Sequence, residues 1–100
     1  MQVRLLTFNI AHGHGFGLYP WRSKAGLTRQ LEALAALLRR VDADIVALQE
    51  VDTDSHWNHR LDLLEHLRAA ASYPFAELAV TNDRGGLKPL LYGNALLSRW

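Results

Sequence analysis

The sequence predicts an α/β (α+β) protein in which helices cover one face of a mixed β-sheet. Two amphipathic helical patterns alternate with four strand-like segments, in the order strand, helix, strand, helix, strand, strand. The 100 residues form one domain at most, and 49% apolar with 21% charged residues is an ordinary composition for a folded chain. The second face of such a sheet needs a cover, and no segment remains to supply it.

The first half of the chain is expected to form strand, loop, helix and strand. Residues 3–10 are rich in β-branched and aromatic side chains, whereas residues 11–21 hold three glycines, two histidines and a proline, which favours a loop. From Leu27 to Val41 the apolar residues recur at steps of three or four, which predicts a helix with one buried face. Residues 43–49 are almost wholly apolar and predict a strand covered on both faces.

The second half is expected to begin with a polar stretch at residues 52–59. A second amphipathic helix follows through Leu63, Leu67 and Ala70, and Pro74 ends it. Residues 75–80 and 92–97 are the remaining strands, joined by a predicted loop over residues 81–89 that contains Gly85 and Gly86.

Composition restricts the possible partners and metal ligands. The net charge of +1 provides no broad attraction for nucleic acid. With no cysteine, a metal must be held by oxygen or imidazole ligands. The chain shows no signal-peptide pattern and no apolar run long enough for a membrane span, so a cytoplasmic location is expected. The chain ends on a strand, which indicates a fragment.

Glu50 is the strongest candidate for a functional residue. It follows the apolar run at residues 45–48, and α/β proteins place their sites at the carboxyl ends of such strands. A lone carboxylate there is costly to bury unless a cation meets it. A strand end that simply reaches solvent explains the same pattern, and this stretch alone does not separate the two explanations.

Three segments resemble the first three blocks of the endonuclease/exonuclease/phosphatase family. They are RLLTFNI at residues 4–10, DIVALQEVD at residues 44–52 and YGNALLSRW at residues 92–100, and the second is the most specific. The resemblance implies that residues 1–100 are the amino-terminal part of one truncated domain of this kind. Members form a four-layer αββα sandwich and hydrolyse phosphoesters with Mg²⁺ or Mn²⁺.

The resemblance assigns roles to individual residues. Glu50 matches the family's metal-binding glutamate, and Asn9 matches the asparagine beside the metal and the substrate phosphate, so both are predicted catalytic and metal-site residues. His12 lies three residues after Asn9 and is expected to contact the substrate phosphate when protonated. The family's later Asp/Asn and Asp/His pairs have no counterpart here, so the isolated 100 residues are predicted to be inactive and the full-length protein active.

The substrate stays open among nucleic acid, phospholipid and small phosphoesters. Ala11, Val51 and Asp52 depart from the apurinic endonuclease pattern, and the motifs look more like a broad bacterial group of metal-dependent hydrolases. The alternatives are a degenerate family member that binds without turnover and an unrelated small α/β binding domain. The isolated fragment is expected to self-associate through its uncovered sheet face.

Two further clusters have rival interpretations. Four histidines could gather around zinc, although their spacing matches no zinc motif: His12, His14, His56 and His59. An aromatic group with one arginine could stack on a base or headgroup, although packing of a loop onto the body is favoured: Tyr19, Trp21, Trp57 and Arg22.

Overall fold

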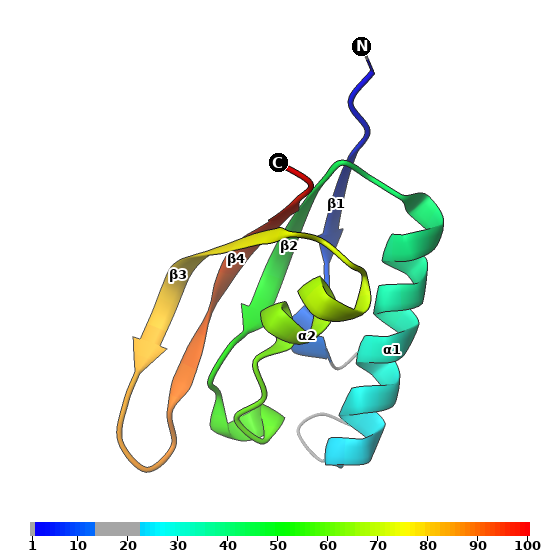
Figure 1. The fold of residues 1–100 in the computed structure, drawn as a ribbon. Coiled ribbons are helices and arrows are strands. Elements are labelled where there is room, and N and C mark those ends of the chain that lie inside the picture. Colours follow the sequence, from blue (N-terminus) through cyan, green and yellow to red (C-terminus); the bar gives the residue numbers. More distant parts are fainter. Residues whose placement is uncertain (1, 14–22) are drawn as a thin grey trace.

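The computed structural model describes residues 2–13 and 23–100 and shows one mixed four-stranded sheet with two helices against one face (Figure 1). The strands are β1 (Leu5–Asn9), β2 (Ile45–Asp52), β3 (Phe75–Arg84) and β4 (Leu90–Ser98), in the sheet order β1-β2-β4-β3. The helices are α1 (Lys24–Val41) and α2 (Leu63–Ala70), with short 3-10 turns η1 (Ala11–Gly13) and η2 (His56–Asn58). The predicted fold class is confirmed.

The sheet combines one parallel pair with two antiparallel pairs. β1 runs parallel to β2, with Leu5 opposite Ile45 and Asn9 opposite Gln49, and α1 makes the crossover between them. β4 is antiparallel to both β2 and β3. The carboxyl ends of β1 and β2 therefore meet at the same edge of the sheet.

Local sequence explains where the helices begin and end. Ser23 caps α1 by accepting a hydrogen bond from the Gly26 N–H at 3.0 Å, and Asp42 ends it in a left-handed conformation. Asp62 caps α2 by accepting from the Glu65 N–H at 3.0 Å.

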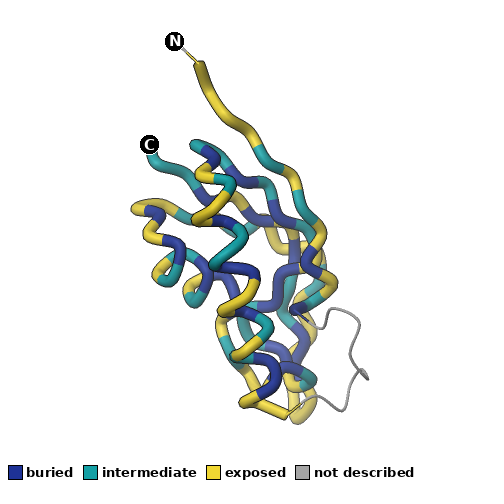
Figure 2. Tube along the Cα trace, turned by 90° about the vertical axis from the view of Figure 1, so that its right-hand side faces the viewer, coloured by how far each residue is buried: buried dark blue, intermediate teal, exposed yellow. Residues whose placement is uncertain are grey.

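The hydrophobic core lies between the helices and the sheet. It is built from leucines of both helices and from alternate strand residues, including Leu27, Leu31, Leu67, Val46 and Leu97. Burial of one such side chain contributes about 1.5–3 kcal/mol. Buried and exposed positions alternate along the chain in Figure 2, as expected for elements with one covered face.

The opposite face of the sheet is open in the described part of the chain, as predicted. Leu5 is 69% exposed, Leu96 48% and Val3 45%, whereas Ile45 and Ala47 are half-buried. Phe75, Val80 and Trp100 also expose large apolar side chains.

Several strand boundaries differ from the sequence prediction. β3 and β4 form a longer hairpin, because Asn82 and Arg84 pair with Tyr92 and Leu90 across positions predicted as a loop. The Arg84 guanidinium donates to the Lys88 carbonyl at 3.0 Å and helps to close the shorter turn. β2 also continues beyond residue 49 to Asp52, through an irregularity described below.

Candidate active site

Glu50 lies in a β-bulge of β2. Leu48 pairs with Ala95 and Val51 pairs with Gly93, so β2 has one more residue than β4 across this interval. Glu50 has a positive φ of 57°, a conformation that non-glycine residues adopt rarely and often at functional sites. Its side chain is 46% exposed. The bulge therefore keeps the carboxylate at the surface while the strand continues.

Asn9 ends β1 and is opposite Gln49, the residue before Glu50. Its side-chain oxygen Oδ1 accepts a hydrogen bond from the Ala11 N–H at 2.8 Å, which starts the turn after the strand. An amide oxygen can accept a second bond and the amide nitrogen can donate, so Asn9 keeps capacity for a metal or a phosphate oxygen. The parallel pairing on which its predicted role depends is confirmed.

His12 lies beside Glu50 because the chain turns sharply after β1. Ala11, His12 and Gly13 have consecutive positive φ values of 49°, 56° and 78°. A Cβ atom at Gly13 would lie 3.0 Å from a Leu27 methyl carbon, so glycine suits both the backbone conformation and the available space. The turn brings His12 Nε2 to 3.7 Å from Glu50 Oε2.

The other ring nitrogen of His12 faces a buried aspartate. His12 Nδ1 lies 3.1 Å from Asp52 Oδ1, and the Asp52 side chain is fully buried. Trp57 Nε1 donates to Asp52 Oδ2 at 2.7 Å, and Asn58 Nδ2 donates to the same oxygen. Asn58 Nδ2 also donates to the His12 carbonyl at 2.7 Å. We call His12, Asp52, Trp57 and Asn58 the buried polar cluster.

Two aromatic rings hold the His12 imidazole from its sides. The Trp57 ring centroid lies 5.1 Å from that of His12, and the Tyr92 centroid lies 4.8 Å away, both in edge-to-face arrangements. Rotation of the imidazole is restricted by these rings and by its bond to Asp52. The described contacts of Trp57 thus fit the favoured packing interpretation.

The other predicted clusters are only partly described. His14, Tyr19, Trp21 and Arg22 lie outside the described residues. His56 Nδ1 lies 3.1 Å from the Pro89 carbonyl oxygen. Within residues 2–13 and 23–100, no three His, Cys, Asp or Glu side chains are arranged to hold a metal.

The sequence prediction missed the buried polar cluster. Asp52 and Asn58 belong to a stretch that was predicted only to be polar, and Trp57 was considered only as part of an aromatic group. The one usable signal is the position of Asp52, which is two residues after Glu50 on the same strand.

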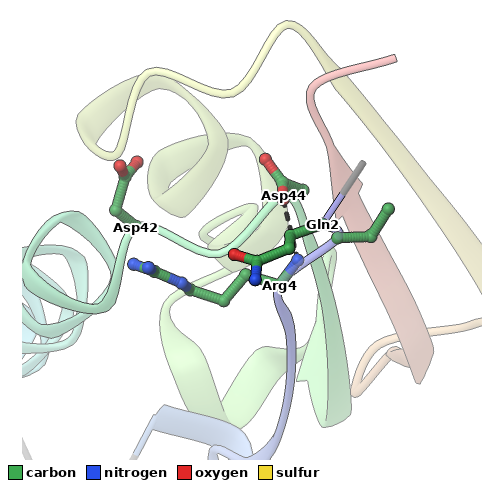
Figure 3. Close-up of a pocket in the computed structure, with 5 residues that line it drawn as sticks. Gln2, Arg4, Asp42 and Asp44 are labelled. Atoms are coloured by element: carbon green, nitrogen blue, oxygen red, sulfur yellow. Dashed lines mark hydrogen bonds between the residues drawn. The ribbon is translucent and has the colours of Figure 1, made fainter.

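A cavity of about 480 Å³ lies at the opposite end of the parallel strands (Figure 3). Arg4 and Asp44 precede β1 and β2, and the Arg4 N–H donates to the Asp44 carboxylate at 2.8 Å. Gln2, Val3 and Asp42 complete the lining. Because sites in open α/β sheets form at the carboxyl ends of strands, the edge with Glu50 is the stronger candidate.

The fold and site define an α+β protein with a polar constellation at the carboxyl edge of one mixed sheet. Residues 6–100 match the sequence model of the Endonuclease/Exonuclease/phosphatase family, and the chain belongs to that family. The resemblance inferred from the three motifs is confirmed.

Solved structures of the family share this fold. An endonuclease/exonuclease/phosphatase from Beutenbergia cavernae superposes with a TM-score of 0.65 at 24% identity over 97% of the chain. A family protein from Leptotrichia buccalis gives a TM-score of 0.53 at 20% identity over 98% of the chain. The chain spans only 26% and 37% of the lengths of these two proteins. A comparison with curated proteins finds no match.

Proposed function

We propose that the full-length protein containing this chain hydrolyses phosphoester bonds and requires Mg²⁺ or Mn²⁺. The observation that carries this proposal is the exposed Glu50 carboxylate at the edge where β1 and β2 end, next to His12 and one register position from Asn9. Membership in a family of nucleases and phosphatases supports the reaction class.

The donor atoms at this edge suit a hard divalent ion. Carboxylate and amide oxygens are preferred ligands of Mg²⁺ and Mn²⁺, which are often held by one or two carboxylates and keep positions for phosphate oxygens. When bound, the ion would stabilise the negative charge that develops on the phosphoryl oxygens during attack by water. Glu50 would hold the ion, and Asn9 would hold it or orient the phosphate.

The role predicted for His12 at the substrate phosphate has a condition set by the geometry. Nδ1 faces the Asp52 carboxylate at 3.1 Å, where an ionised carboxylate would accept its hydrogen, so only Nε2 can face the substrate. Donation from Nε2 to a phosphate oxygen then requires the doubly protonated ring.

The substrate can be nucleic acid, phospholipid or a small phosphoester, and the proposed location is the cytoplasm. Within the described residues, neither helix is long and apolar enough to cross a membrane.

The test uses the full-length protein with bis(p-nitrophenyl) phosphate, in Mg²⁺ or Mn²⁺ and in a chelator. We expect metal-dependent turnover that Glu50→Gln lowers by roughly 10²-fold or more, as for other losses of electrostatic stabilisation. The matched control is Glu65→Gln, since Glu65 is exposed on α2 and pairs with Arg68. Metal and phosphoester binding without turnover in the unaltered protein would favour the non-catalytic binding module instead.

A further inference from the structure

We infer that His12 and Glu50 together ligate the metal, with Asp52 as the positioning residue, so that the site favours a first-row transition ion over Mg²⁺. This inference rests on the proposed function, because it takes Glu50 to be a metal ligand. It adds a nitrogen ligand to a site for which the sequence named only Glu50 and Asn9 as metal residues.

Asp52 determines the tautomer of the His12 ring. An ionised carboxylate accepts hydrogen bonds and cannot donate them. Asp52 faces Nδ1 at 3.1 Å, and its other oxygen already accepts from Trp57 and Asn58, so an ionised Asp52 assigns the hydrogen to Nδ1. In the neutral ring the lone pair is then on Nε2. The tautomer that Asp52 selects is the one that can bind a metal through Nε2.

Nε2 of His12 and the Glu50 carboxylate are spaced for one metal ion between them. Their separation of 3.7 Å is too long for a hydrogen bond, and both atoms are then Lewis bases. A Zn–N bond of about 2.0–2.1 Å and a Zn–O bond of about 2.0–2.2 Å together exceed that separation. One ion can therefore contact both atoms at a bent angle with little movement of either side chain.

Buried side chains support His12 on the side away from Glu50. Metal-binding histidines commonly donate their other ring N–H to a carboxylate, which fixes the ring orientation. Here that carboxylate is fully buried and is itself held by Trp57 and Asn58. The edges of Trp57 and Tyr92 restrict the ring further. His12 is therefore oriented before any ion arrives.

A nitrogen ligand changes which metal ions the site prefers. Imidazole nitrogen suits zinc and other late first-row ions, whereas Mg²⁺ prefers oxygen and near-ideal octahedral geometry. Ligation by His12 and Glu50 leaves positions open for further oxygen ligands, including those of the substrate. The pair of His12 and Glu50 thus fits a first-row ion from Mn²⁺ to Zn²⁺ and should bind Mg²⁺ more weakly.

The experiment measures metal binding by the full-length protein without substrate. Electron spin-echo spectra of the Mn²⁺-loaded protein should show coupling to an imidazole nitrogen, and His12→Gln should remove it. By calorimetry, His12→Gln and Asp52→Asn should weaken Zn²⁺ binding by roughly 10–100-fold, the range known for losses of supporting residues. Mg²⁺ binding should change little. His66→Gln is the control, because His66 pairs with Glu32 on the helices.

The results separate this inference from the proposed function. Absence of imidazole nitrogen coupling in the unaltered Mn²⁺ protein would overturn the inference without any variant, so misfolding of a mutant cannot hide the answer. Unchanged Zn²⁺ affinity in His12→Gln with a raised KM would also overturn it, in favour of the phosphate contact. Unchanged affinity for every metal in Glu50→Gln would instead refute the metal role in the proposed function.

Discussion

Replacing Asp52 by alanine removes the acceptor at the centre of the buried polar cluster. Three side-chain donors lose a bond, from His12, Trp57 and Asn58. A bond to a charged group contributes about 1.5–3 kcal/mol, so the simple sum is about 4.5–9 kcal/mol. That sum is an upper bound, because Asn58 keeps its bond to the His12 carbonyl and removal of a buried charge recovers desolvation energy. We therefore expect Asp52→Ala to lower the free energy of unfolding by about 3 kcal/mol.

The control is Asp54→Ala, two residues further along the chain. The Asp54 side chain is 41% exposed and forms an ion pair with Arg60, so its removal should change stability far less. Hydrogen bonds from Arg60 lower the pKa of Asp54. The small stabilisation is therefore present above the ordinary aspartate pKa and is lost as the pH falls through the lowered value.

The assay is urea unfolding of the full-length protein, followed by far-UV circular dichroism. The free energy of unfolding is compared among the unaltered protein, Asp52→Ala and Asp54→Ala at one pH. If Asp52→Ala lowered it by less than about 1 kcal/mol, within the range of a typical single hydrogen bond, the cluster would not be buried and bonded as described.

The remaining predictions concern the sheet and its uncovered face. In Gly93→Ala the new Cβ would lie 2.0 Å from the Ala79 carbonyl oxygen, so we expect β3 and β4 to separate locally. The free energy of unfolding, measured by denaturant titration, should fall by at least about 2 kcal/mol. In Tyr73→Phe we expect the free energy of unfolding at neutral pH to fall by about 1 kcal/mol. Burial raises the pKa of Tyr73, so the unaltered protein should lose stability as the pH rises through that raised value, and the phenylalanine variant should lack this alkaline loss. The isolated 100 residues should self-associate in sedimentation velocity, less so with Leu5→Lys and Leu96→Lys, whereas a monodisperse, cooperatively unfolding monomer of the unaltered piece would contradict this.

Much of the fold could be predicted because its signals are local. The leucine spacing in α1 reports a single buried face, and the apolar run in β2 reports a strand covered by helices. The positions of the strand ends were predicted less accurately. Thr81, Asn82 and Asp83 have turn-like polarity, yet pairing with β4 extends β3 through them, and such pairing is not visible in a local pattern.

The candidate site also contains residues that could be predicted from the sequence and residues that could not. Glu50 could be selected because it follows a predicted apolar strand, whereas Asn9 was selected through the family resemblance and His12 through its position three residues after Asn9. Asp52 and Asn58 could not, because their burial depends on contacts with His12, which is 40 and 46 residues distant in sequence. A polar side chain that will meet buried partners has the same local signature as one that will meet solvent.

The bulge in β2 connects the two acidic residues of the site. In a regular strand, residues 50 and 52 would point to the same face and share one environment. The extra residue and the positive φ of Glu50 break that alternation. Glu50 remains 46% exposed, while the Asp52 side chain is fully buried. One backbone irregularity thus presents one carboxylate to solvent and turns the other inward to orient His12. His12 lies between the two carboxylates, with Nδ1 facing Asp52 and Nε2 facing Glu50.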